Sequence, residues 1–174
     1  IHFAVQNKEQ RVFIRSKLVG AYNVSNCLAA YCVTVYGLGI SPEIAALGIS
    51  ALVGIPGRME RIDMGQNFTV IVDFAHTPNA LKSALEAGRT MSKGRLISVF
   101  GSAGLRDKEK RRMMAETSAE LADLTVLTAE DPRTESLDGI LEEMADGARS
   151  KGGREGETCW RMPDRGDAIR YALK

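Results

Sequence analysis

The sequence predicts an α/β fold, in which a mostly parallel sheet carries helices on both faces and is preceded by a partial α/β unit. Two observations support this class. Apolar runs rich in β-branched residues and without alternating polarity, such as residues 68–72, are typical of strands that are buried on both faces. Longer helical patterns separate these runs, and strands that alternate with helices form parallel sheets.

The first part of the chain predicts one hairpin and two helices. Residues 1–18 alternate loosely between apolar and polar side chains, a pattern that indicates a hairpin. A helix is expected over residues 23–36, with Asn23 as its cap. A second helix is expected over residues 41–52, because Ser41 can cap it and a proline occupies its first turn.

A domain boundary is expected at about Gly57. The stretch Gly54-Ile55-Pro56-Gly57 combines residues that break helices and strands, which is typical of the connection between domains. We therefore expect residues 1–57 to be the last part of one domain and residues 58–174 to form another.

After this boundary, strands and helices alternate. Thr77, Ser136 and Asp164 each precede a helical pattern and can cap it. The expected strands are residues 68–72, 95–100, 124–128 and 158–161, and the expected helices are residues 78–91, 108–121, 137–150 and 165–173.

The two ends of the chain suggest a piece of a longer protein. The sequence begins at Ile1 without an initiator methionine, a basic leader or a small-residue cleavage site. It ends after a helical pattern, where an alternating fold would place a further strand. We therefore expect a fragment that is truncated at both ends.

The composition is that of a soluble globular protein and gives no electrostatic case for binding nucleic acid or a membrane. The chain has 23 basic and 22 acidic side chains, a net charge of +1. Its longest apolar stretch, residues 27–40, is too short to cross a bilayer. The cysteines, Cys27, Cys32 and Cys159, lack the spacing of metal ligands and are expected to be packed thiols of a cytoplasmic protein.

Polar side chains follow three successive strands of the predicted sheet. Because ligands of open α/β sheets bind beyond the carboxyl ends of the strands, these side chains predict a cleft for a charged substrate. The alternative is a solvated edge held by ion pairs that contribute little, with the first two residues serving as a turn cap and a structural histidine. The three sets are Asp73 with His76, Arg106 with Asp107, and Glu130 and Asp131 with Arg133.

Two neighbouring patterns are ambiguous. The glycine-rich stretch 101–104 invites comparison with phosphate loops, but its spacing fits neither the dinucleotide fingerprint nor the G-x-x-x-x-G-K-[ST] loop. The basic run that follows is interpreted as a solvated helix face, although Arg106 before it could bind a carboxylate or phosphate through two hydrogen bonds. This run consists of Lys108, Lys110, Arg111 and Arg112.

Five strings in this order resemble the central to carboxyl-terminal part of the Mur ligase family. They are LVGAYNVSNCLAA, GIPGRMERI, VIVDFAHTPNAL, VFGSAGLRDKEKRRMM and TAEDPRTE. Together they extend over nearly the whole chain. The last two favour the branch of UDP-N-acetylmuramoyl-dipeptide ligases, which add the third residue of the stem peptide, over the folylpolyglutamate synthases, which share the fold.

The resemblance implies a three-domain, ATP-dependent amide ligase of the cytoplasm, expected to be a monomer. ATP with Mg²⁺ phosphorylates the carboxylate of a UDP-N-acetylmuramoyl peptide, and the amine of a free amino acid attacks the acyl phosphate. Residues 1–57 would be the end of the central ATP-binding domain, and residues 58–174 a truncated, Rossmann-like carboxyl-terminal domain. The family's phosphate loop, magnesium ligands and late lysine-glycine-histidine-glutamate segment would lie outside this chain, so the fragment alone is expected to be inactive.

The resemblance also implies ATP contacts. Asn26 resembles the residue that contacts adenine, although an asparagine in a first helical turn is usually a local hydrogen-bonding residue. Arg58 resembles the arginine that reaches the ATP phosphates across the domain junction, and Asp73 the residue that holds the ribose. His76 belongs to the same signature.

Four further residues resemble the family's amino-acid site. Arg106 matches the arginine that meets the incoming amino acid, and Glu130, Asp131 and Arg133 occupy the loop that selects it. Members that use diaminopimelate usually have Asp-Asn-Pro-Arg where this chain has Glu-Asp-Pro-Arg. Arg133 favours a substrate with a distal carboxylate, whereas the additional acid favours a distal amine, as in lysine or ornithine.

Two alternatives remain at this stage. One is a non-catalytic, ligase-like module that binds a partner or peptide. The other is a related amide ligase with a different acceptor, such as a folylpolyglutamate synthase.

Overall fold

The computed structural model describes residues 1–6 and 10–174, which form an α/β protein, as predicted. The chain folds into two compact units, Ile1–Phe74 and Ala75–Lys174. The boundary predicted at Gly57 stays a prediction.

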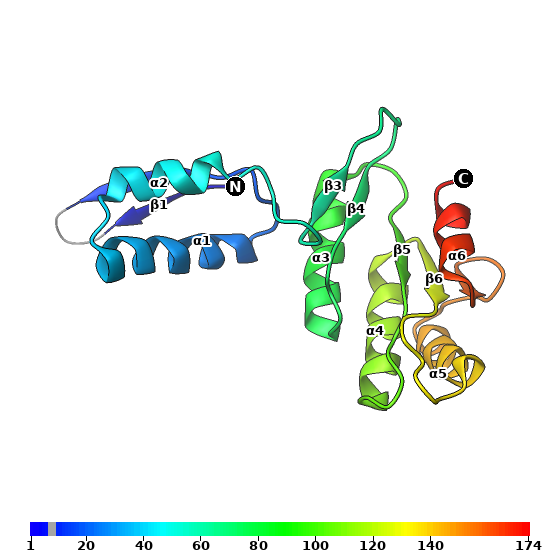
Figure 1. The fold of residues 1–174 in the computed structure, drawn as a ribbon. Helices are drawn as coiled ribbons and strands as arrows, with labels where there is room; N and C mark the ends of the chain where they lie inside the picture. Colours follow the sequence, from blue (N-terminus) through cyan, green and yellow to red (C-terminus); the bar gives the residue numbers. More distant parts are fainter. Residues whose placement is uncertain (7–9) are drawn as a thin grey trace. The chain divides into compact units, whose positions relative to one another are not determined.

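An antiparallel hairpin begins the amino-terminal unit (Figure 1). Strand β1 (His2–Gln6) pairs with β2 (Arg11–Arg15), and Phe3 lies opposite Ile14. The predicted hairpin is therefore confirmed; residues 7–9 between the strands lie outside the described residues.

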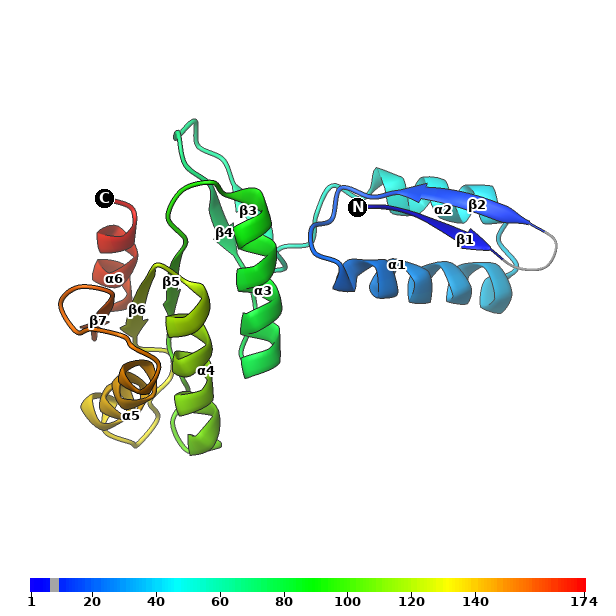
Figure 2. The same cartoon turned by 180° about the vertical axis from the view of Figure 1, so that it is seen from behind.

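Two helices pack against the hairpin (Figure 2). Helix α1 (Tyr22–Cys32) continues as the π-helix η1 (Val33–Gly37), and α2 (Pro42–Ala51) follows. The hairpin contributes alternate side chains to the core of this unit, because successive residues of a strand point to opposite faces. The buried members of the core are Ile14, Tyr31, Ala45 and Ala46, with Phe3, Val5 and Val12 packed against them.

One of the two predicted helix caps in this unit is present. The hydroxyl of Ser41 accepts the Ile44 N–H at 3.3 Å and caps α2. The prediction for Asn23 was wrong, because α1 begins at Tyr22 and Ala21 occupies the cap position, two residues before Asn23. The Asn23 amide instead donates to the Val19 carbonyl at 2.6 Å.

The strand expected at residues 68–72 is shorter than predicted and less buried. Strand β4 (Val70–Val72) pairs antiparallel with β3 (Glu60–Ile62) in a two-stranded sheet, and Val72 is 47% exposed. An apolar, β-branched run is compatible with a half-buried hairpin strand as well as with a buried parallel one. The polar, glycine-containing stretch 63–67 allows the chain to reverse and pair with itself.

The carboxyl-terminal unit is built on a parallel sheet of order β5-β6-β7. All of its predicted strands and helices after residue 77 are present, and Thr77, Ser136 and Asp164 cap their helices as expected. Its elements are α3 (Pro78–Met91), β5 (Ile97–Phe100), α4 (Lys108–Leu121), β6 (Leu124–Thr128), α5 (Leu137–Ser150), β7 (Cys159–Met162) and α6 (Arg165–Ala172).

Helices cover both faces of this sheet (Figures 1 and 2). Buried side chains of α3, α4 and α5 form one core with Phe100, Leu127 and Cys159 of the three strands. Val126 is fully buried and, as the neighbour of Leu127 along β6, points to the other face. Helix α6 contacts all three strands, and its Ala168 is fully buried.

Among the described residues, no helix is both long and apolar enough to span a bilayer. All three cysteines are free, and Cys27 and Cys159 are buried.

Gly147 of α5 allows a close approach to α4 and supplies a test of this packing. A Cβ at Gly147 would lie 2.6 Å from the backbone oxygen of Arg112. We expect Gly147→Ala to lower the free energy of unfolding by about 1–3 kcal/mol, because backbone atoms cannot move aside easily. Urea denaturation measures this change.

The matched control is Gly139→Ala on the same helix. A Cβ there would meet only the Ser136 side chain, at 3.6 Å, which is an ordinary contact. The better helix propensity of alanine should leave stability unchanged or raise it by up to about 1 kcal/mol. Equal losses in both variants would contradict the packing described here.

Candidate functional site

The parallel register brings the exits of the three strands to one edge. Phe100 lies beside Leu127, and Thr128 lies beside Met162. The loops 101–107 and 129–136 therefore leave from neighbouring positions at the carboxyl ends of β5 and β6, where α/β sheets bind ligands. Arg165, at the start of α6, donates to the Ala129 carbonyl at 2.9 Å and joins the third exit to the second.

The two glycines of the first loop allow its backbone to touch that of the second. A Cβ at Gly101 would lie 2.4 Å from the Thr128 oxygen, and one at Gly104 would lie 1.9 Å from the Pro132 oxygen. The Gly104 N–H donates to the Asp131 carbonyl at 2.8 Å. The glycine-rich stretch is thus explained by backbone packing between the loops, without a phosphate.

Arg111 lies beneath both loops and is completely buried. Its guanidinium donates twice to Glu135, from Nη1 at 2.8 Å and from Nη2 at 3.0 Å, and once to Glu143 at 2.9 Å. Nη2 also donates to the Ala103 carbonyl at 3.2 Å. The interpretation of the basic run as a solvated face was therefore wrong for Arg111, although its neighbour Arg112 is exposed and pairs with Glu116.

The four residues predicted to bind the amino acid lie on these two loops and are exposed. Arg106 follows Gly104 on the first loop, and Glu130, Asp131 and Arg133 follow β6 on the second. Asp131 accepts the Arg133 N–H at 3.2 Å, and the Nε of Arg133 lies 3.7 Å from the other oxygen of this carboxylate. The structure brings these loops together, and such exposed charges can bind a small zwitterion without a large desolvation cost.

In the amino-terminal unit, Asp73 fixes a tight turn that carries Arg58. Residues Ile55–Arg58 close a turn by the Arg58 N–H donating to Ile55 at 3.0 Å, with Gly57 at φ 67°. The carboxylate of Asp73 accepts the N–H of Met59, which is also left-handed (φ 48°), at 2.7 Å. The side chain of Asp73 therefore has a structural partner, in agreement with part of the alternative interpretation.

The Arg58 guanidinium is exposed but held in orientation. It lies over the Phe74 ring, 4.6 Å from the centroid, in a cation–π contact. Burial and the charge of Asp73 raise the pKa of Tyr22, while the charge of Arg58 opposes this rise. Tyr22, Arg58 and Asp73 are therefore close enough to interact, so the first turn of α1 lies near this turn.

Asn26 and His76 lie at the surface. The Asn26 amide donates to the Asn23 oxygen at 2.9 Å on the same helix. His76 is exposed and belongs to the carboxyl-terminal unit, whereas Asp73 belongs to the amino-terminal one. The expectation that Asp73 follows a strand of the parallel sheet was wrong, because β4 pairs with β3; the shared pocket stays a prediction.

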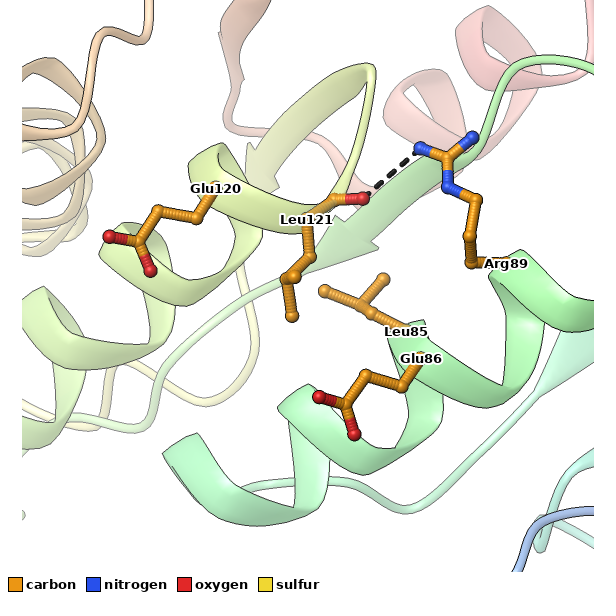
Figure 3. Close-up of a pocket in the computed structure, with 5 residues that line it drawn as sticks. All are labelled: Leu85, Glu86, Arg89, Glu120 and Leu121. Carbon is orange, nitrogen blue, oxygen red and sulfur yellow. Dashed lines mark hydrogen bonds between the residues drawn. The ribbon is translucent and has the colours of Figure 1, made fainter.

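A hollow of about 400 Å³ lies between α3 and α4, away from these loops (Figure 3). It is formed by the later turns of both helices, which precede β5 and β6, and therefore lies toward the amino ends of the strands. Arg89 closes one side by donating to the Leu121 carbonyl at 3.1 Å and to Asp123 at 2.8 Å. The lining residues are Leu85, Glu86, Arg89, Glu120 and Leu121.

The described residues offer no group of three or more histidine, cysteine or acidic side chains that could hold a metal ion.

Sequence reasoning missed Arg111 as a residue that organises the site. The signal was the spacing of 111, 114, 115 and 118, which places Arg111 on the buried face of α4 with Met114, Ala115 and Ser118. Phe74, the platform of Arg58, carried no comparable signal, because its apolar character is common at the end of a strand.

Comparison with known proteins identifies a family to which part of this chain is similar. Residues 57–174 match the family described as "Mur ligase, glutamate ligase domain".

Longer relatives are similar to this chain over most or all of its length. The UDP-N-acetylmuramoyl-L-alanyl-D-glutamate–2,6-diaminopimelate ligase of Solibacter usitatus is 41% identical over 174 residues, which are 100% of this chain and 34% of the relative. The UDP-N-acetylmuramyl-tripeptide synthetase of Roseiflexus sp. is 45% identical over 159 residues, 91% of this chain and 31% of the relative. A solved UDP-N-acetylmuramoyl-L-alanyl-D-glutamate–2,6-diaminopimelate ligase is 30% identical with a TM-score of 0.61, over 99% of this chain and 34% of that one. The chain thus spans about a third of the length of these relatives.

Glu135 gives the candidate site a pH dependence. Hydrogen bonds from Arg111, and then from the Leu105 N–H, lower the pKa of Glu135 from 4.5 to about 2. Because the folded-state pKa is the lower one, ionised Glu135 stabilises the fold fully above pH 4.5, and this stability is lost as the pH falls toward 2. We expect Glu135→Gln to reduce the steepness of this acid loss, measured by thermal unfolding between these pH values.

The control is Glu130→Gln, which also removes one negative charge from this loop but at an exposed position. An unchanged acid profile in Glu135→Gln would show that the pairing with Arg111 does not stabilise the protein.

Proposed function

The chain belongs to the Mur ligase family, and from this premise we propose that it is part of an ATP-dependent amide ligase that adds an amino acid to a UDP-N-acetylmuramoyl peptide in peptidoglycan synthesis. The observation that supports this most directly is the contact between loops 101–107 and 129–136, whose backbones approach at Gly104 and Pro132. The names of two relatives support the proposal, since one is a UDP-N-acetylmuramoyl-L-alanyl-D-glutamate–2,6-diaminopimelate ligase and the other a UDP-N-acetylmuramyl-tripeptide synthetase.

The two loops suit a free amino acid that carries a charged tail. Arg106 and Arg133 offer planar donors for carboxylates, and Glu130 and Asp131 offer acceptors for an ammonium group. Their exposure leaves these groups accessible, and the packed backbones beneath them keep their separation constant. We propose that Arg106 meets the amino acid and that the Glu130–Arg133 segment selects it.

The amino-terminal unit suits one side of a nucleotide. Arg58, oriented by Phe74, is proposed to bind phosphate oxygens, Asp73 a ribose hydroxyl, and Asn26 the adenine. His76, which belongs to the carboxyl-terminal unit, is proposed as a further ATP contact. ATP with Mg²⁺ supplies activation of the acceptor carboxylate as an acyl phosphate. A fixed guanidinium is suited to this chemistry, because phosphoryl transfer needs positive charge in place before charge develops.

We further propose that the parent protein acts in the cytoplasm as a monomer, and that the 174-residue chain alone has no turnover, because it spans only about a third of its relatives. The test is ADP release by the parent with UDP-N-acetylmuramoyl dipeptide and, separately, diaminopimelate, lysine and ornithine. Release with one of the three is expected. No release with any would favour a non-catalytic module or a ligase with another acceptor.

The selecting role of Arg133 makes a specific prediction. Arg133→Ala should lower kcat/KM for diaminopimelate by roughly tenfold to a hundredfold, because a charged hydrogen bond to its distal carboxylate is lost. Lysine and ornithine, which have no distal carboxylate, should be affected less. Arg154→Ala, which removes a side chain that is 68% exposed elsewhere on the same unit, is the control. Equal losses for all three amino acids would mean that this loop only supports the structure.

The role of Arg58 is tested on the ATP side. Arg58→Ala should lower kcat/KM for ATP by roughly a hundredfold, because a preorganised charge near the phosphates is removed. Arg61→Ala, at an exposed position of β3, should leave this parameter within about twofold. A similar loss in both variants would contradict a specific phosphate contact. Steady-state kinetics with ATP varied at saturating amino acid measures the difference.

A further inference from the structure

We propose that Arg111 and Glu135 are a pair of positioning residues that set the distance between Arg106 and the Asp131–Arg133 segment, and through it the choice of amino acid. This inference rests on the proposed function. Neither residue is expected to touch the substrate, because Arg111 is completely buried and its partners are protein groups.

The first argument is that Glu135 holds both loops. Its side chain accepts two hydrogen bonds from Arg111 and one from the N–H of Leu105, the residue before Arg106, at 2.5 Å. Its own N–H donates to the Pro132 carbonyl at 3.0 Å and closes the turn that contains Arg133. A displacement of Glu135 would therefore move the backbone on both sides of the candidate amino-acid site.

The second argument is backbone strain at Arg133 and at the residue that precedes Arg106. Leu105 has φ 52° and Arg133 has φ 51°, the left-handed conformation that L-residues other than glycine rarely adopt. Such conformations persist where the surroundings determine them, and they are concentrated at binding sites. Here the strained residues are Arg133 itself and the residue before Arg106, and Glu135 bonds directly to one and closes the turn of the other.

The third argument is the chemistry of Arg111. Only a planar guanidinium can donate in parallel to both oxygens of Glu135 while also reaching Glu143 and the Ala103 carbonyl. A lysine keeps the charge but cannot reproduce this geometry. The pair thus fixes an angle and a distance between the loops as well as stabilising them.

The test uses the parent ligase with Arg111→Lys. We expect KM for the preferred amino acid to rise about tenfold and its advantage over the other two amino acids to fall by a similar factor, because a small misplacement weakens a multipoint contact. KM for ATP should stay within about twofold, since the proposed ATP contacts Asn26, Arg58 and Asp73 belong to the other unit and His76 lies outside the two loops. Arg112→Lys, an exposed arginine on the same helix, is the matched control and should change neither parameter.

A second variant separates positioning from general destabilisation. Glu135→Gln keeps the size of the side chain but weakens both charged bonds, and native-state hydrogen exchange of the parent should show faster exchange at the Leu105 amide than in the wild type. The amides on the buried face of α5, such as those of Met144 and Ala145, should keep their protection. The proposal would be overturned if exchange became faster throughout the carboxyl-terminal unit, or if the exchange rate of the Leu105 amide did not change.

The two possible failures are distinguishable. If the parent is inactive with every amino acid, the proposed function fails, while hydrogen exchange still tests the pair. If the parent is active and Arg111→Lys changes both KM values equally, or neither, the positioning role fails and the proposed function stands.

Discussion

The candidate site depends on a direct contact between two backbones. The loops after β5 and β6 approach so closely that side chains at residues 101 and 104 would collide with main-chain atoms. This approach requires neighbouring parallel strands in the observed register, and glycine at both positions. Once the backbones are in contact, the exposed side chains that the two loops carry are held near one another.

Below this contact the protein places a charge where water cannot reach it. The burial of Arg111 is compensated by two carboxylates and a carbonyl, and removal of Glu135 would leave Glu143 as its single carboxylate partner. The exposed layer above has the opposite character, since Arg106, Glu130 and Asp131 remain accessible to solvent. The buried layer of side chains thus positions the loops, and the exposed layer presents charged groups to solvent.

The sequence was sufficient to predict the elements of the carboxyl-terminal unit, because caps such as Ser136 and helical spacing are local signals. It was insufficient for β4, since an apolar run does not specify its pairing partner, and for Asn23, because the preceding turn moves the helix start. Arg111 was predicted to be solvent-exposed because charged side chains are rarely buried without a partner. Its partner Glu135 is 24 residues away in the sequence, so the pair is recognised only in the fold.

The two-layer arrangement has an evolutionary consequence. Under the proposed function, substitutions at exposed positions such as 130 and 133 would change the recognition chemistry while leaving the buried pair in place, so a descendant could acquire a new amino-acid preference by single mutations. Residues 111 and 135 are constrained differently, because they bond to each other and the effect of a change in one depends on the residue at the other. The exposed residues of the site can therefore change one at a time, whereas Arg111 and Glu135 depend on each other.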